Sequence, residues 1–301
     1  MSDQIVKVHH LNCATLCPVS LKNIINNTCK VLSKLPLRIP NILKDIGGKN
    51  VQEVIHEHLV CHCLLIETKK KLILMDTGLG RKDVQSSGSR LPIEFLKIIG
   101  RPLLKLEETA YHQIIKLGYS PDDLTDILVT HLDVDHVGGL ADFPQATVHL
   151  LDAELDSAIN PKSYIQKHRY LAKMWDHNPK WKTYRASGEK WNDFYSVKEL
   201  EGLPTEIKMI PLRGHTQGHC GLVIEHQGNS LFFTGDAYIS KKQLQGITPF
   251  EVLLFNKLIQ EDINLYRENL ERIIQLKNEA LPSLSIFCSH DPDEYHHLSN
   301  P

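Results

Sequence analysis

Thr130-His131-Leu132-Asp133-Val134-Asp135-His136-Val137-Gly138-Gly139-Leu140 is the stretch around which the chain is organised. It places four side chains that can bind a metal within six residues, in the order His-x-Asp-x-Asp-His. The apolar residues 127–129 before it are typical of the end of a buried strand, and the glycine pair lets the backbone turn into the next element. A strand that delivers imidazoles and carboxylates to a loop can build a metal cage. The stretch therefore predicts a metal site, and not a solvated polar loop, because matching ligands recur downstream.

The composition is that of an ordinary globular protein. The chain has 301 residues, of which 42% are hydrophobic and 23% charged, a size that large α/β folds reach as one domain. Its formal net charge of −2 gives no indication of a nucleic-acid partner. Residues 1–7 lack a basic and then apolar signal pattern, and no apolar run reaches membrane length. We expect a cytoplasmic protein with a small-molecule substrate and no membrane partner, and the oligomeric state stays open.

The cysteines do not form the pattern of a small disulfide scaffold. There are seven of them: Cys13, Cys17, Cys29, Cys61, Cys63, Cys220 and Cys288. An odd number at these spacings predicts buried free thiols in a reducing compartment. The pairs Cys13-x3-Cys17 and Cys61-x-Cys63 remain alternative metal ligands.

Hydrophobic patterning predicts hairpins and helices in two similar halves. Strands are expected at residues 4–16, 51–66, 72–75, 127–129, 146–151, 206–212, 221–225, 231–233 and 284–287. Helices are expected at 91–106, 111–117, from Asp152 onward and at 256–279, with a covering loop at 19–50 and a polar loop at 81–90. This order is not a simple βα repeat. Two sheets packed together with helices outside fit it best.

Residues 160–196 differ from the rest of the chain. They contain all three tryptophans and several other aromatic side chains, interrupted by Pro161, Pro179 and Gly188. We expect an aromatic-rich helical insertion here, serving either as an extra core patch or as a lid over a pocket, because aromatic side chains with a polar group suit substrate contact.

Further candidate ligands follow the later strands. The full set is His131, Asp133, Asp135, His136, His215, Asp236 and His290. Each of the later members comes directly after a strand-like segment. Seven ligands with one shared carboxylate are about what two adjacent metals need while leaving positions open for water and substrate.

This ordered set resembles the metallo-β-lactamase superfamily, and the resemblance covers nearly the whole chain. The family pattern His-x-His-x-Asp-His, Gly-His-Thr-x-Gly-His, Gly-Asp and a late His has its counterparts in 131–136, 214–219, 235–236 and His290, and Asp76-Thr77-Gly78 matches an early family turn. The resemblance implies an α/β fold, a four-layer αβ/βα sandwich formed by residues 1–301 as one domain. It implies that His131, Asp133 and His215 hold one metal, that Asp135, His136 and His290 hold the other, and that Asp236 bridges them.

One departure from the family concerns the first metal. The second His of the family pattern is Asp133 here. A third carboxylate, together with a bridging hydroxide, brings two divalent metals to about neutral charge. We therefore expect a less electrophilic centre that accepts harder metals. Two divalent metal ions are expected as cofactors, zinc first, with iron or manganese as alternatives.

A second departure concerns the substrate. The layout is most similar to the lactonase-like branch, in which a Tyr shortly after the bridging Asp polarises the substrate carbonyl. Tyr238 lies two residues after Asp236, one short of the expected spacing, so its side chain can point elsewhere. We retain Tyr238 as a candidate catalytic residue, and we expect His219 to support the ligands and not to bind a metal.

The sequence thus predicts a metal-dependent hydrolase that attacks an ester or lactone carbonyl, with Asp135 as a ligand that also accepts a proton. One alternative is a phosphoesterase of the same superfamily, for which Arg213 is a candidate phosphate contact. The other is a di-iron oxidoreductase similar to flavodiiron proteins, which carry a carboxylate at the position of Asp133. Their flavin domain is not expected here, because Pro301 follows His290 by eleven residues.

Overall fold

The computed structural model describes residues 3–18, 58–186, 188, 190–197, 199–279 and 282–300. The covering loop expected at 19–50, and residues 51–57 of the second expected strand, lie outside this part of the chain. Each of the other expected strands is present.

The first sheet has six strands in the order β1-β2-β3-β4-β5-β6. They are β1 (Ile5–Leu16), β2 (Leu59–Thr68), β3 (Leu72–Met75), β4 (Leu124–Leu128), β5 (Thr147–Leu151) and β6 (Lys180–Tyr184). β2 is antiparallel to both of its neighbours, β1 and β3, and β3 to β6 run parallel. The carboxyl ends of β3 and β4 therefore meet at one edge of the sheet.

The second sheet has four strands in the order β12-β11-β10-β9. They are β9 (Ile207–Pro211), β10 (Cys220–His226), β11 (Asn229–Phe233) and β12 (Leu284–Phe287). The pairs β9/β10 and β10/β11 are antiparallel, whereas β11 and β12 are parallel. A separate two-stranded ribbon joins β7 (Lys190–Trp191) to β8 (Phe194–Tyr195).

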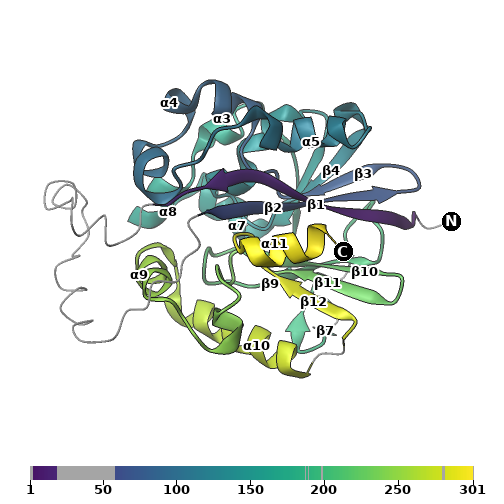
Figure 1. Ribbon diagram of the computed structural model, residues 1–301, viewed down its shortest axis with the longest axis vertical. Helices are drawn as coiled ribbons and strands as arrows, with labels where there is room; N and C mark the ends of the chain where they lie inside the picture. Colours follow the sequence, from purple (N-terminus) through teal and green to yellow (C-terminus); the bar gives the residue numbers. More distant parts are fainter. Residues whose placement is uncertain are drawn as a thin grey trace, which may run out of the picture.

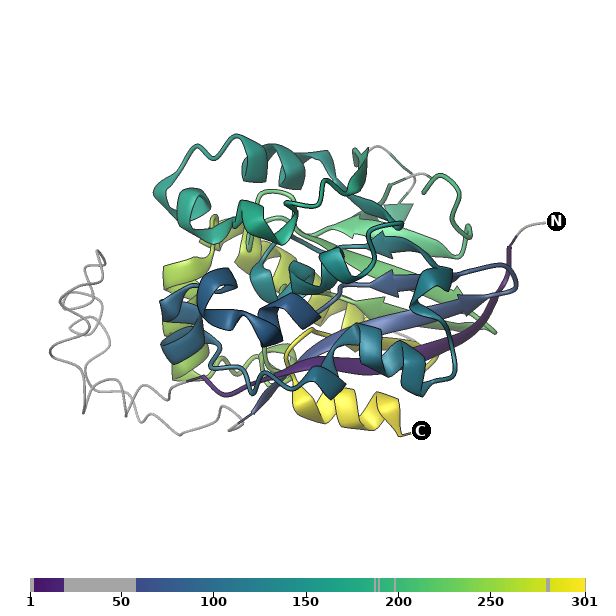
Figure 2. The ribbon, with the colours of Figure 1, turned by 90° about the horizontal axis from the view of Figure 1, so that it is seen from above.

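The two sheets pack face to face, and helices cover their outer faces (Figures 1 and 2). Side chains alternate along each strand. In β2, Leu64 and Ile66 join the core between the sheets, where they share a cluster with Phe233 and Phe287. Leu65 points to the opposite face, into the core under the helices of the first half. The predicted four-layer αβ/βα sandwich is confirmed.

The helices of the first half cover the first sheet, and α9 and α10 cover the second (Figure 1). The helices of the first half are α3 (Arg81–Gln85), α4 (Ser87–Arg90), α5 (Ala110–Lys116), α6 (Val134–Val137), α7 (Asp152–Ile159) and α8 (Tyr164–Arg169). Those of the second half are α9 (Phe250–Ile259), α10 (Ile263–Glu279) and α11 (Pro292–Ser299). In the described part of the chain, no helix combines the length and the apolar character needed to cross a membrane.

Three helix predictions need correction. Residues 81–90 are two short helices and not a loop, because the buried Asp83 carboxylate accepts hydrogen bonds from the Gly80 amide (2.9 Å) and Arg90 Nε (2.7 Å). The helix expected at 91–106 is reduced to single turns at Phe95–Ile99 and Leu106–Glu108, since Arg101 and Leu104 adopt positive φ around Pro102.

The third correction is that the long helix expected at 256–279 is two helices. Gln260, with an extended backbone, separates α9 from α10. The interruption lets Glu261 N donate to His215 O (3.2 Å) and Asp262 N to Gly214 O (2.9 Å). The helix break thus ties the outer layer to the loop that carries His215.

The segment 160–196 is only partly helical. It forms α8, then β6 as an edge strand of the first sheet, and the β7/β8 ribbon. Trp175 and Trp181 pack against the core of the first half, and Trp191 is buried in the core beneath α10.

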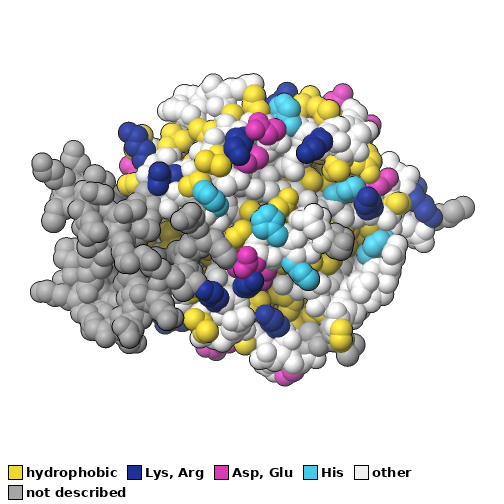
Figure 3. Space-filling model, in the orientation of Figure 1, with side chains coloured by type: hydrophobic (Ala, Val, Ile, Leu, Met, Phe, Trp, Pro, Cys, Tyr) yellow, Lys and Arg dark blue, Asp and Glu magenta, His cyan; other side chains and the backbone are white. Residues whose placement is uncertain are grey.

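On the face shown in Figure 3, acidic and basic side chains of the described residues are interspersed, with no continuous field of one sign.

Candidate metal centre

The predicted ligands converge from the ends of several strands. His131, Asp133, Asp135 and His136 follow β4, and α6 begins within this stretch. The others come from the second sheet: His215 after β9, Asp236 after β11 and His290 after β12. Because β3, β4, β11 and β12 all end here, side chains far apart in the sequence meet at one place.

The Asp76 carboxylate organises the loop after β4. It accepts hydrogen bonds from Thr130 N (2.8 Å), Thr130 Oγ1 (2.8 Å) and His136 Nδ1 (2.8 Å). The turn after it needs Gly78, which has φ +62° and approaches Cys13 so closely that a Cβ would lie 2.3 Å from the Cys13 Cβ. The early Asp-Thr-Gly sequence therefore positions the ligand loop.

The Asp236 carboxylate lies at the centre of the cluster, and both of its oxygens face imidazoles. Oδ1 is 3.3 Å from His136 Nε2 and 3.2 Å from His290 Nε2. Oδ2 is 3.3 Å from His290 Nε2, 3.6 Å from His215 Nε2 and 4.0 Å from His131 Nε2. A carboxylate in this position can bridge two cations.

All four histidines present Nε2 to the centre, because their Nδ1 atoms are held from behind. His136 Nδ1 donates to Asp76 and His215 Nδ1 to Gln260 Oε1 (2.9 Å). His290 Nδ1 donates to the Val60 carbonyl (2.8 Å), and His131 Nδ1 to the Thr130 hydroxyl (2.9 Å), whose own proton goes to Asp76. Such outer contacts fix the tautomer of metal-binding histidines and orient their rings.

Several inner atoms lack hydrogen-bond partners. His131 Nε2, His136 Nε2, Asp133 Oδ1 and Asp236 Oδ1 are buried and have no hydrogen-bond partner among the described residues. Although burial alone lowers the pKa of His136, the carboxylates of Asp236 and Asp76 raise it well above the ordinary value. Buried polar atoms without partners are costly. The cluster therefore has the donor set and the negative charge that fit divalent metals.

Two half-sites can be distinguished around Asp236. In the first, ligand atoms of His131, Asp133 and His215 lie within 4.8 Å of one another. Asp133 Oδ2 is 3.1 Å from His215 Nε2 and 3.4 Å from His131 Nε2. Of the residues expected in the second half-site, Asp135 Oδ2 lies 3.8 Å from His290 Nε2, and His136 groups with His131 and Asp236.

Arg169 is a site residue that the sequence did not indicate. It ends α8, its side chain is only 7% exposed, and its Nη1 lies 3.5 Å from Asp133 Oδ2. Nη1 also donates to the His215 carbonyl (3.0 Å) and Nη2 to the Ile259 carbonyl. Against the effect of burial, the Arg169 guanidinium and His131 hold the pKa of Asp133 well below its ordinary value. The extra carboxylate of this centre thus has its own buried cation.

Glu154 is a second residue without a signal in the sequence. Its buried carboxylate, in α7, accepts hydrogen bonds from Leu132 N (2.9 Å), the Thr216 hydroxyl (2.6 Å) and Gly218 N (3.1 Å). Burial raises its pKa to about 7. Glu154 therefore joins the two loops that carry His131 and His215.

His219 has the supporting place that was expected. Its Nδ1 donates to the Leu212 carbonyl (2.8 Å), and its Nε2 accepts from the amide of Asp236 (2.9 Å). Both ring nitrogens are used within the protein, and neither is free to bind a metal.

Tyr238 is not brought together with the ligands. It is fully buried in the core of the second half, and its hydroxyl donates to Glu294 Oε1 (2.9 Å) and Oε2 (3.1 Å). The residue at the spacing used by lactonase-like enzymes is Ile239. The catalytic role expected for Tyr238 therefore has no support in the geometry, because its hydroxyl is directed to α11.

A two-sheet sandwich with this cluster at its strand ends defines a metal-dependent hydrolase. The chain belongs to the Metallo-beta-lactamase superfamily, whose family model matches residues 57–290. A probable metallo-hydrolase of Mycobacterium tuberculosis is 34% identical over 292 residues, covering 96% of this chain and 82% of the relative. The N-acyl homoserine lactonase AiiA of Bacillus thuringiensis subsp. kurstaki is 26% identical over 238 residues, covering 77% of this chain and 81% of the lactonase.

Solved structures agree on the fold. An N-acyl homoserine lactone hydrolase with its product N-hexanoyl-L-homoserine at the catalytic metal centre superimposes with a TM-score of 0.66 at 20% identity, covering 99% of this chain and 97% of the other. The dizinc quorum-quenching lactonase AidC gives a TM-score of 0.54 at 20% identity, with 97% and 91% covered. At these identities the likeness shows the fold alone.

Proposed function

We propose that the protein is a dinuclear metal hydrolase that opens an ester or lactone bond of a small molecule. The observation that carries this proposal is the central position of Asp236: Oδ1 faces His136 and His290, and Oδ2 faces His215 and His131 as well as His290. A single metal could not bind all four imidazole nitrogens, and either His136 and His290 or His131 and His215 would have no metal to bind. The lactonase relatives support a carbonyl substrate.

In this proposal the ligands divide as the two half-sites do. His131, Asp133 and His215 hold the first metal. Asp135, His136 and His290 hold the second, and Asp236 joins the two. Zinc is the first candidate, and the oxygen donor of Asp133 makes the first half-site acceptable to iron or manganese as well.

Arg169 changes the charge expected for the loaded centre. The third carboxylate was expected to make the centre less electrophilic. The buried guanidinium beside Asp133 restores the positive charge that this carboxylate removes. We therefore assign the centre the electrophilic strength of a site with two carboxylates, with the additional cation held on α8.

The reaction then uses residues already in place. When bound, divalent metals would supply a Lewis acid for the carbonyl oxygen and would lower the pKa of a bound water toward neutrality. Asp135, whose carboxylate lies beside His290, would accept the proton of the attacking water and pass it to the alkoxide that leaves as the ester C–O bond breaks. His136 and His290 keep Nε2 directed inward through their bonds to Asp76 and the Val60 carbonyl, so the centre needs little rearrangement.

A substrate panel with metal control tests the proposal. Zinc-loaded protein should hydrolyse N-acyl homoserine lactones or simple esters, followed as acid release. Chelation should abolish the activity and zinc should restore it. Cleavage of a phosphodiester only would point to the phosphoesterase alternative, in which Arg213 was a candidate. In the structure, Arg213 Nη2 is bonded to Gln217 Oε1 (2.9 Å). Oxygen reduction by iron-loaded protein, without hydrolysis, would point to the oxidoreductase alternative.

A further inference from the structure

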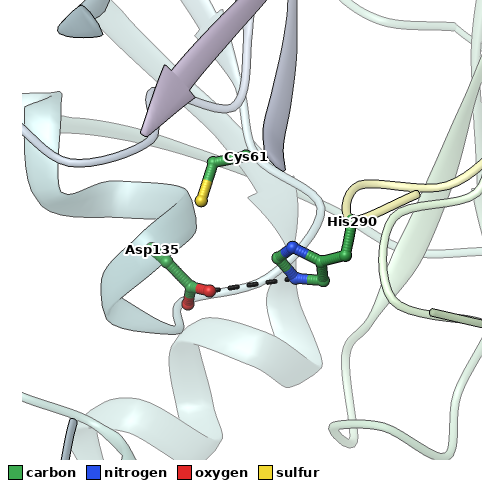
Figure 4. A group of neighbouring side chains, drawn as sticks. All are labelled: Cys61, Asp135 and His290. Carbon is green, nitrogen blue, oxygen red and sulfur yellow. Dashed lines mark ion pairs between the residues drawn. The ribbon is translucent and has the colours of Figure 1, made fainter. Parts of the chain in front are cut away.

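The sulfur of Cys61 lies beside the second half-site. Ligand atoms of Cys61, Asp135 and His290 lie within 4.8 Å of one another. Figure 4 shows the three side chains converging, Cys61 from β2, Asp135 from the loop and helix after β4, and His290 from the loop after β12. The sequence left Cys61 open as a metal ligand, and the pattern of the other seven residues does not include it.

The backbone holds Cys61 in place against His290. The residue before it, Val60, accepts the Nδ1 proton of His290 through its carbonyl (2.8 Å). The residue after it, His62, donates its amide to the Ser289 carbonyl (2.9 Å). The amide of Cys61 itself donates to Asn12 Oδ1 (3.1 Å). The positions of the thiol and of the imidazole are therefore set by the same contact between β2 and the loop after β12.

Near Cys61, candidate ligand atoms are buried and lack hydrogen-bond partners among the described residues. The side chain of Asp236 is only 7% exposed, and its Oδ1, which has no hydrogen-bond partner among the described residues, lies 3.2 Å from His290 Nε2. The Cys61 sulfur is likewise free of hydrogen bonds to described residues, whereas Cys63 Sγ contacts the Cys61 carbonyl (3.7 Å) and Cys220 Sγ the Val129 carbonyl (3.6 Å). Cys61 thus differs from the other buried thiols nearby.

We propose that Cys61 is a thiolate ligand of the second metal, beside Asp135 and His290. This inference rests on the dinuclear centre proposed above. As the sulfur–metal bond forms, the S–H bond breaks and its proton leaves to solvent. Bonds of about 2.3 Å to sulfur and about 2.1 Å to nitrogen bring two neighbouring ligand atoms of one metal to roughly 3.1–3.6 Å from each other, whatever the number of ligands. The ligand atoms of Cys61, Asp135 and His290 now lie within 4.8 Å of one another, so a small movement of these side chains is enough for them to bind one metal.

The consequence is a centre with two chemically different halves. Asp133 adds a hard oxygen donor to the first half-site, and Cys61 adds a soft sulfur donor to the second. Thiolates favour zinc, and carboxylates favour manganese and similar cations. The second half-site should therefore keep zinc, cobalt or cadmium when the first exchanges its metal for manganese or iron.

Cobalt is a suitable probe, because a thiolate bound to Co²⁺ gives a charge-transfer absorption in the near ultraviolet that nitrogen and oxygen ligands do not. We would load the full chain with two equivalents of Co²⁺ and compare wild type with Cys61→Ala, Cys61→Ser and the control Cys63→Ala. Cys63 is a matched control because it is buried on the same face of β2, two residues along. Metal content and circular dichroism are measured on the same samples.

The expected result is a charge-transfer band in wild type and in Cys63→Ala that is absent from both Cys61 variants. The Cys61 variants should also bind the second metal at least about tenfold more weakly. If wild type binds two cobalt ions without the band, or if the folded Cys61 variants retain it, the assignment of Cys61 fails and the dinuclear centre stands. If wild type binds fewer than two ions, the dinuclear centre fails and the assignment fails with it.

Discussion

Replacing Arg169 by Met tests whether the extra carboxylate of the centre depends on a buried cation. The guanidinium lies 3.5 Å from Asp133 and is 7% exposed, while the Asp133 side chain is 19% exposed. At an effective dielectric constant of about 20, two unit charges at this separation attract by roughly 5 kcal/mol. Removing one member of a buried pair costs about 3–5 kcal/mol, because the other charge stays behind. Since Asp133 is partly exposed, we expect Arg169→Met to lower the free energy of unfolding by about 3 kcal/mol, the lower end of this range.

The assay is urea unfolding of the chelator-treated protein, followed by circular dichroism, so that no metal contributes. Four proteins form a double-mutant cycle: wild type, Arg169→Met, Asp133→Asn and the double variant. We expect a coupling energy of about 2 kcal/mol, because Arg169→Met costs less once Asp133 is neutral. Lys162→Met is the control: Lys162 lies 79% exposed just before α8, and its loss should leave the unfolding midpoint unchanged.

A coupling energy below about 0.5 kcal/mol would show that the two charges act independently. In that case Arg169 would stabilise the fold only through the carbonyls of His215 and Ile259. The charge balance assigned to the centre would then be wrong.

Three further predictions concern residues around the centre. Burial raises the pKa of Glu294 from 4.5 to about 7. Between these two values the folded protein keeps a proton that the unfolded chain loses, so the contribution of Glu294 to the free energy of unfolding falls as the pH rises. Glu294→Gln should therefore flatten the change in urea midpoint between about pH 5 and about pH 8, and an unchanged profile would contradict it. Asp76→Ala should weaken metal binding roughly 10–100-fold in a competition titration, since His136 loses its support, and wild-type affinity would refute that role. Tyr238→Phe should keep ester turnover within about twofold while lowering stability by about 1 kcal/mol, and a much larger loss of turnover in folded protein would return Tyr238 to the catalytic residues.

The convergence of the candidate ligands could be predicted from the sequence because their signal is local. His131 to His136 lie within one short stretch, and His215, Asp236 and His290 each follow an apolar strand. The carboxyl ends of these strands must meet once the sheets form, so proximity could be inferred before any coordinates. The apolar segments that precede these ligands also predicted the strands of the two sheets.

The residues that support the ligands could not be predicted in this way. Arg169 and Glu154 lie on helices in polar stretches, where a charged residue is usually solvated. Their burial depends on where α7 and α8 pack against the loops of the second sheet, which is a tertiary contact. The break at Gln260 was missed for the same reason, since the bonds of residues 260–262 to the loop of His215 are tertiary contacts.

Tyr238 shows the limit of spacing arguments. Strand alternation does not extend to Tyr238, because a turn follows β11 and the Ala237 amide donates to the Thr234 carbonyl (3.2 Å). In the structure the hydroxyl of Tyr238 is directed to Glu294 of α11. The family pattern thus predicted the type of centre, and the individual residues of this chain determine its details.

Metal stoichiometry tests the central claim most directly. Wild type, Asp236→Ala and the exposed control Asp122→Ala would be dialysed against zinc under identical conditions and analysed by elemental mass spectrometry, with folding checked by circular dichroism. Because both half-sites share Asp236, we predict about two zinc ions per chain in wild type and control, and fewer than one in folded Asp236→Ala. An Asp236→Ala protein that still holds two zinc ions per chain would contradict the bridged centre.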